Sequence, residues 1–232
     1  MPSKRDENKQ DLILIKPSDV LDRSSTSFSE KIISSIMSDG QIDVVGLGTS
    51  IFLACSAVNI STDIANVHIH EVTLDYIEFP FLGKSEVIIF TLKNAPRGKH
   101  TQVMAKELNE KMKLTTERDG QLIVISRRQT IERTVQMCLW KLINFERIKL
   151  MAGGSAINNA IRTALVLAKG NISKQPLFIE LISLEKFYRS RGDQTKPITG
   201  IHIYIKKGKE KESSKHKKLL ASIKSQIQVP NL

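Results

Sequence analysis

Hydrophobic residues recur along the chain in two similar blocks. Between Gly40 and Ala65, an apolar strand pattern enters a turn with two glycines, and a helical pattern with apolar residues at i, i+3, i+4 and i+7 follows. The same order begins again at Arg147, and the two blocks align when Gly48 is placed on Gly154. The pattern therefore predicts an internal repeat.

The repeat extends on both sides of these blocks. A short strand and a helix precede each block, and two strands joined by a tight turn follow it. Each copy thus reads strand, helix, strand, helix, strand, strand, which predicts an α/β chain made of two α+β units with two layers each. The flanking elements are predicted at residues 11–15, 28–37, 67–79 and 86–92 in the first copy, and at 121–125, 131–143, 177–187 and 198–206 in the second.

Composition marks the ends of these units. We expect a disordered N-terminus over residues 1–10, the first unit at 11–94, a partly helical linker at 95–118 and the second unit at 119–208. The remaining residues, 209–232, form a tail with six Lys and two Glu. Within the tail, Leu219, Leu220, Ile223 and Ile227 have the spacing of a helix that docks through one apolar side.

The two copies share an apolar pattern but differ in net charge. The chain has 35 Lys and Arg against 24 Asp and Glu, a net charge of +11. Residues 11–94 carry five basic and eleven acidic side chains, net −6, whereas residues 119–208 carry fifteen and six, net +9. A basic surface favours a polyanionic partner, because phosphates release counterions when Lys and Arg neutralise them. We therefore expect the second copy, and not the first, to bind phosphate.

Two clusters hold basic residues of the second copy. Arg127 and Arg128 follow its first strand, where a helix begins near Thr130. Their guanidinium groups are expected beside a helix N-terminus, which itself favours anions.

The second cluster is a predicted hairpin from Glu185 to Lys196 with its turn at Gly192 and Asp193. A basic two-stranded arm of this kind reaches into a nucleic-acid groove, and Tyr188 offers stacking on an unpaired base. The alternative interpretation is a solvated hairpin with ordinary surface charges. Its basic residues are Lys186, Arg189, Arg191 and Lys196.

Motifs for other chemistry are incomplete. Gly46 and Gly48 precede a helix, but Ile51 stands where a dinucleotide-binding turn needs its third glycine, so we interpret them as a tight strand-to-helix turn. His68 and His70 share one face of a predicted strand without an evident third metal ligand. The carboxylates of the second copy are too scattered to hold a catalytic metal. We expect no enzyme activity, no cofactor and no metal site.

The sequence also favours an intracellular protein. Its start lacks the apolar core of a signal peptide, and its most apolar stretch, residues 51–60, is far shorter than the roughly 18 to 20 residues that span a bilayer. Cys55 and Cys138 stand far apart in apolar helical patterns, so we expect two small buried thiols. We expect a cytoplasmic location, no membrane partner and no small-molecule substrate.

The second unit resembles the Alba family of archaeal nucleic-acid-binding proteins over nearly its full length. The resemblance rests on SRRQTIERTV at residues 126–135, AGGSAINNAI at 152–161 and the basic hairpin before GIHIYIKKG at 200–208. Alba proteins form dimers that bind DNA and RNA, so the fused pair implies an internal pseudo-dimer in the archaeal cytoplasm or nucleoid. The family's basic loop and hairpin arm imply a binding surface of Arg127, Arg128, Arg133, Gly154, Ser155, Asn158, Asn159, Lys186, Arg189, Arg191 and Lys196.

Two features depart from the family. The glycine turn of the second unit has Gly153, Gly154 and Ser155 where the family has an Arg between small residues, and backbone amides with Asn158 or Asn159 are expected to replace part of that phosphate contact. The first unit has Lys16, Pro17 and Ser18 in place of the basic pair, and its hairpin is short and apolar. We interpret the first unit as a degenerate half that supplies an interface.

These observations predict a nucleic-acid-binding protein for double-stranded DNA, structured RNA or both, with little sequence specificity. The alternative is a protein-interaction module that pairs with another Alba-type protein or an RNA-processing complex without binding nucleic acid. A homodimer or a heteromer with another Alba-type protein is compatible with both.

Overall fold

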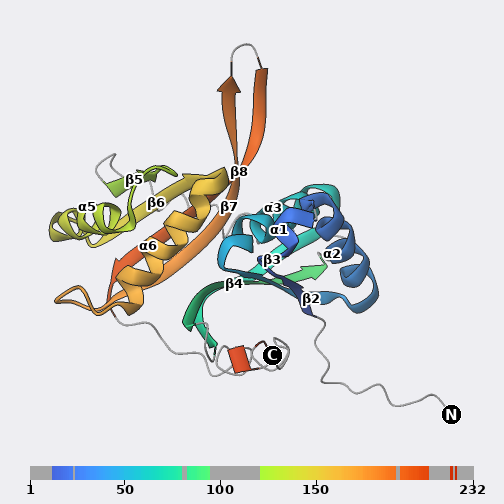
Figure 1. Cartoon of the computed structure of the whole chain (residues 1–232), viewed down its shortest axis with the longest axis horizontal. Coiled ribbons are helices and arrows are strands. Elements are labelled where there is room, and N and C mark those ends of the chain that lie inside the picture. Colours follow the sequence, from blue (N-terminus) through green and yellow to red (C-terminus); the bar gives the residue numbers. More distant parts are fainter. Residues whose placement is uncertain are drawn as a thin grey trace, which may run out of the picture.

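The computed structural model describes residues 12–22, 24–79, 83–94, 121–191, 194–208, 220, 221 and 223. The described residues form an N-terminal unit (residues 12–94) and a C-terminal unit (residues 121–208), which lie side by side (Figure 1). The predictions for residues 1–10 and 95–118 and for most of 209–232 lie outside the described residues.

The N-terminal unit has one four-stranded sheet in the order β1-β2-β4-β3. β1 is parallel to β2, and the other neighbours are antiparallel. The order of elements is the predicted one, with one added turn of helix, α1, after β1. The elements are β1 (Leu12–Ile15), α1 (Asp19–Asp22), α2 (Ser25–Asp39), β2 (Gln41–Leu47), α3 (Ile51–Ile64), β3 (Val67–Phe79) and β4 (Gly83–Asn94).

The C-terminal unit repeats this topology, with its sheet in the order β5-β6-β8-β7. The predicted pair of α+β units is therefore confirmed. The last two strands are longer than predicted, because β7 and β8 stay paired from Leu177 and Lys207 out to Arg191 and Gln194. The elements are β5 (Leu122–Ile125), α5 (Ile131–Asn144), β6 (Arg147–Gly153), α6 (Ile157–Lys169), β7 (Leu177–Arg191) and β8 (Gln194–Lys207).

Local chemistry explains where the helices begin and end. The hydroxyl of Ser24 accepts from the amide of Ser27 at the start of α2, and Gly40, with φ of 74°, ends that helix in the left-handed region. Gly48 and Gly154 also have positive φ, 50° and 59°, in the short turns that lead into α3 and α6. These turns confirm the structural interpretation of the repeated glycines, because residues other than glycine are strained in this region.

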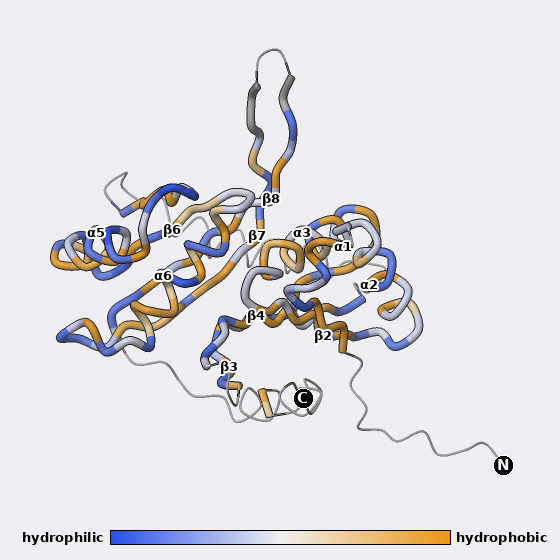
Figure 2. The backbone as a smooth tube through the Cα atoms, in the orientation of Figure 1, coloured by the Kyte–Doolittle hydropathy of each residue, from blue (hydrophilic) through white to orange (hydrophobic). Residues whose placement is uncertain are grey.

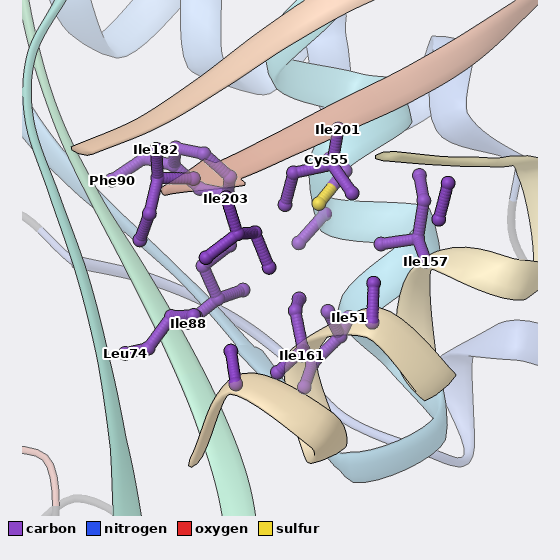
Figure 3. Packing of buried hydrophobic residues seen from close by; sticks show 14 of the residues in the cluster. Ile51, Cys55, Leu74, Ile88, Phe90, Ile157, Ile161, Ile182, Ile201 and Ile203 are labelled. Atoms are coloured by element: carbon purple, nitrogen blue, oxygen red, sulfur yellow. The ribbon is translucent and has the colours of Figure 1, made fainter. Parts of the chain in front are cut away.

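One hydrophobic core joins the two units. Alternating residues of β6 are buried against the helices, and α6 contacts β3 of the other unit while α3 contacts β7 and β8. Figure 3 shows side chains of both units in the same cluster, with Ile51 and Cys55 of α3 near Ile157 and Ile161 of α6. The structure thus has the expected internal pseudo-dimer, and its halves share a core.

The outer face of the N-terminal sheet, away from its helices, carries a second apolar cluster. It contains Ile223 of the tail, which is fully buried, together with partly buried Leu220. Figure 2 shows the hydrophobic residues that follow one another along β2 and β4. Leu220 and Ile223, two of the four tail residues with helical apolar spacing, therefore pack on the N-terminal unit. The sheet residues of the cluster are Val45, Leu47, Ile77, Val87 and Ile89.

The C-terminal sheet covers the equivalent face with its own side chain. An added Cβ on Gly200 would lie 2.5 Å from the ring of Phe187, and one on Gly153 would lie 3.0 Å from it. The ring of Phe187 therefore lies flat over two glycines of neighbouring strands. At the positions of Leu47 and Val87, which form part of the cluster around Ile223, the C-terminal sheet has Gly153 and Gly200.

Candidate nucleic-acid interface

The basic loop, residues 126–130 between β5 and α5, is a tight turn. The amide of Gln129 donates to the carbonyl of Ser126 at 3.2 Å, and the amide of Ser126 donates to the side-chain oxygen of Gln129 at 3.4 Å. Arg127 and Arg128 occupy the exposed corner of this turn. Thr130 then caps α5, because its hydroxyl accepts from the amide of Arg133 at 3.3 Å.

Asn159, in the first turn of α6, fixes the shape of the basic loop. Its side-chain nitrogen lies 3.4 Å from the carbonyl oxygen of Ser126, 3.3 Å from that of Arg127 and 3.2 Å from that of Gln129. The sequence suggests Asn159 as a phosphate ligand, but its donor group is directed at the loop backbone. Asn159 is therefore a positioning residue for the two arginines.

The N-terminal unit keeps this turn and lacks its cations. The amide of Lys16 donates to the carboxylate of Asp19 at 2.8 Å, and the amide of Asp19 donates to the carbonyl of Lys16 at 2.9 Å. Pro17 and Ser18 thus occupy the corner positions that Arg127 and Arg128 hold in the other unit. An acidic Asp19 in the place of a neutral Gln makes this loop unsuited to phosphate.

The hairpin arm is the part of β7 and β8 that extends beyond Glu185 and Gly200. The sheet register places Gly153 beside Gly200 and Gly200 beside Glu185, at the end of the sheet where β5 enters the basic loop. The arm and the loop therefore project from the same end of the C-terminal sheet, and Figure 1 shows the arm extending away from both units.

The register also fixes which arm residues face each other. Arg189 is paired with Lys196, and Arg191 is paired with Gln194. Tyr188 is 70% exposed, as expected for a residue that could stack on a base. The predicted turn at Gly192 and Asp193, and the side chains of Arg189 and Arg191, lie outside what the structure describes.

In the part of the chain that the structure describes, three cations of the C-terminal unit are paired with carboxylates of the N-terminal unit. Lys186, which the sequence suggests as a phosphate ligand at the base of the arm, lies 2.7 Å from Asp63. The other pairs across the interface are Arg162 with Glu86 at 2.9 Å and Lys169 with Asp75 at 2.6 Å.

Further cations are paired inside the C-terminal unit. Arg147 and Lys206 both approach Glu180, at 2.5 and 3.6 Å, and Lys207 lies 3.5 Å from Glu146. By contrast, the exposed residues Arg127, Arg128, Arg133 and Lys196 have no ion pair within the part of the chain that the structure describes. Four exposed cations without an ion pair among the described residues therefore lie at the end of the unit with the loop and the arm.

The glycine turn of the C-terminal unit leads from β6 into α6. Gly154 and the exposed Ser155 lie between β6 and α6, close in the chain to the loop-holding Asn159. Asn158 faces the other unit, where its side-chain nitrogen donates to the carbonyl of Thr49 at 3.3 Å. Asn158 therefore belongs to the contact between the units.

His202 lies beneath Phe187 at the base of the arm. Its Nδ1 is 2.8 Å from a carboxylate oxygen of Glu185, and the two rings have centroids 5.4 Å apart. Burial lowers the pKa of His202 below its usual value of 6.5, although the carboxylate of Glu185 acts in the opposite direction. The imidazole is therefore mainly neutral at pH 7.

The cysteines are buried free thiols, as the sequence predicts. Burial raises the pKa of both, that of Cys138 to about 12, so neither is a nucleophile at neutral pH. Within the described ranges, no three His, Cys, Asp or Glu side chains gather to hold a metal. None of the helices in those ranges is long and apolar enough to cross a membrane.

Sequence reasoning misses the roles of Asn159 and of the interface carboxylates. The repeat alignment contains a signal for the first, because Asn159 corresponds to the buried apolar residue Leu53 of the other copy. For Asp63, Asp75 and Glu86 the sequence gives only an acidic total, since their partners are far away in the chain.

Comparisons with known proteins give distant structural likenesses. No family model matches the chain, and no curated protein matches it in sequence. Among solved structures, the crystal structure of ALBA1 from Trypanosoma brucei is similar at 18% sequence identity and a TM-score of 0.32. The match covers 46% of this chain and 97% of that one.

Proposed function

We propose that the C-terminal unit binds the phosphate backbone of DNA or structured RNA through the basic loop and the hairpin arm, without catalysing a reaction. The N-terminal unit supports the binding unit and does not contact phosphate. Binding is largely electrostatic and weakly sequence-specific, because phosphate contacts carry no direct sequence information.

The main support for this proposal is the difference between cations that are paired with carboxylates and cations that are not. Carboxylates pair with Arg147, Arg162, Lys169, Lys206 and Lys207 elsewhere on the C-terminal unit. Among the described residues, Arg127, Arg128 and Arg133 have no such pair and are exposed beside the start of α5. A helix N-terminus has a partial positive charge, so adjacent cations raise the local potential further. An anion at this position interacts favourably with the arginines and with the helix end.

The arm adds a second argument of the same kind. Arg189 and Lys196 are directly opposite each other in the sheet register. The backbone register therefore places two basic residues of the sequence at one paired position of the arm, as a ligand with a phosphate backbone requires. The resemblance of residues 126–135 to the Alba family supports the same ligand.

A salt titration tests the proposal. Binding of fluorescently labelled duplex DNA and of a structured RNA is measured by anisotropy from 50 to 300 mM salt. Each phosphate contact with duplex DNA contributes about 0.9 to the slope of log K against log salt. We expect Arg127→Ala with Arg128→Ala to weaken binding to all sequences and to reduce that slope by about 1.8.

The matched control removes two charges elsewhere. Lys31 and Lys174 are exposed and lie outside the basic loop and the arm, so Lys31→Ala with Lys174→Ala should leave the slope nearly unchanged. Absence of binding at low salt for both ligands would contradict the proposal and favour the protein-interaction module. The ratio of the DNA and RNA affinities identifies the preferred ligand.

A further inference from the structure

The two sides of the interface between the units carry opposite charges. Among the described residues, three ion pairs cross the interface, and in each the carboxylate belongs to the N-terminal unit and the cation to the C-terminal unit. The carboxylates lie at the end of α3, on β3 and on β4, and the cations lie on α6 and β7. The pairs are Asp63 with Lys186, Asp75 with Lys169 and Glu86 with Arg162.

Pseudo-symmetry shows what a pair of like units would contain. Lys169 and Asp63 occupy equivalent positions near the ends of α6 and α3, by the alignment of Gly154 with Gly48. The bulges of β3 and β7 set a common register, in which Lys186 corresponds to Tyr76 and Glu185 corresponds to Asp75.

Two C-terminal units would therefore bring like charges together. Lys169 of one unit would approach Lys186 of the other, and the same repulsion would occur twice. Glu185 stands in the place of Asp75, but its carboxylate already lies 2.8 Å from His202. Arg162 would meet the hydroxyl of Thr199, the counterpart of Glu86, and would lose its ion pair.

Two N-terminal units would have the opposite problem. Asp63 of one unit would approach Asp75 of the other, again twice. Glu86, whose side chain is 18% exposed, would face Ser56, the counterpart of Arg162, and would be partly desolvated without a cation. Carboxylates without partners at a half-buried interface oppose association.

The apolar part of the interface does not distinguish these pairings, because α3 and α6 both present small and aliphatic residues to the shared core. The charges at the interface therefore determine which unit is bound. Half-exposed ion pairs contribute about two- to fivefold each, so three pairs, with the like-charge contacts they replace, favour unlike units by about tenfold to hundredfold.

We propose that the interface of the C-terminal unit is a docking surface that selects the acidic N-terminal unit of its own chain and rejects a second C-terminal unit. The charge asymmetry of the two copies then serves assembly as well as ligand binding. It prevents two basic units from combining into a symmetric, two-sided binding surface.

Charge reversal in the full-length chain tests this selection without nucleic acid, so its outcome is separate from that of the proposed function. Lys169→Asp with Lys186→Asp, and Asp63→Lys with Asp75→Lys, should each lower the thermal midpoint. The four substitutions together should recover most of the loss, because the ion pairs form again with reversed polarity. Lys31→Asp with Lys174→Asp makes the same charge change away from the interface and controls for net charge.

A mixing experiment tests the rejection of like units. The Lys169→Asp, Lys186→Asp chain has carboxylates on both sides of its own interface, and the Asp63→Lys, Asp75→Lys chain has cations on both sides. A mixture of these two chains should therefore form mixed dimers in native mass spectrometry, because opposite charges meet only between the chains. Neither chain alone should pair through its C-terminal unit. If these variants do not fold, Lys169→Gln with Lys186→Gln should still make the thermal midpoint less sensitive to salt than that of the wild type.

The proposal is wrong if the thermal midpoint of the variant with all four substitutions is no higher than the sum of the effects of the two double variants predicts. It is also wrong if wild-type chains crosslink through paired C-terminal units, or if neither the mixture nor the salt sensitivity responds to these substitutions.

Discussion

Asn159→Ala should weaken nucleic-acid binding without removing any charge. The side-chain nitrogen of Asn159 lies within 3.4 Å of three carbonyl oxygens of the basic loop. An amide has two hydrogens, so at most two full hydrogen bonds are lost, each with a net value of about 1 kcal/mol. We expect the free energy of unfolding to fall by about 1–2 kcal/mol.

The effect on affinity follows from loop order. With Asn159 removed, the loop that carries Arg127 and Arg128 must be ordered when the ligand binds, and fixing the backbone of one residue costs about 1–2 kcal/mol. If binding must order the backbone of about one additional residue, this cost weakens binding by about five- to thirtyfold. The number of phosphate contacts is unchanged, so the salt slope should stay that of the wild type.

Anisotropy titrations at three salt concentrations separate this effect from loss of the arginines. Asn158→Ala is the matched control, because Asn158 is the preceding residue of α6 and contacts Thr49 instead of the loop. The reasoning is refuted if Asn159→Ala binds as tightly as the wild type at every salt concentration. It is also refuted if Asn159→Ala lowers the salt slope as much as the double arginine variant does.

Two further predictions concern stability. Ile223→Ala should lower the free energy of unfolding, measured in denaturant titrations, by about 2 kcal/mol, because Ile223 is fully buried on the N-terminal sheet. Ala221→Ser, at an exposed neighbouring position, should have little effect. Equal effects of the two substitutions would contradict docking of Ile223 on the sheet. The folded-state pKa of His202 lies below 6.5, so the unfolded chain binds its proton first, and stability should decrease as pH falls from about 7 through 6.5. His202→Gln should flatten this dependence more than His70→Gln, and an unchanged pH profile would show that His202 is not responsible.

Much of the fold could be predicted from the sequence because its signals are local. Apolar residues at helical spacing predict α5 and α6, and alternation predicts β3 and much of β7. The glycine turns at Gly48 and Gly154 connect strands to helices at equivalent points, which is why the repeat was visible without a structure. The length of the arm was underestimated, because its outer residues are polar and only pairing between β7 and β8 extends the strands.

The candidate site was predictable only in part. Arg127 and Arg128 were found because they are adjacent in sequence and precede a helix. The ion pair of Lys186 could not be predicted, because its partner Asp63 lies in the other unit. Asn159 was assigned to phosphate, because the sequence does not show that three loop carbonyls surround its amide.

The sequence by itself thus determined the repeat, the order of strands and helices, and the opposite charges of the two copies, since each depends on neighbouring residues or on composition. Only the tertiary structure decided which cations are paired with carboxylates, and that Leu220 and Ile223 pack on the N-terminal sheet. The physical reason is that ion pairs and burial depend on distances between segments far apart in the chain, and packing of the two units sets those distances.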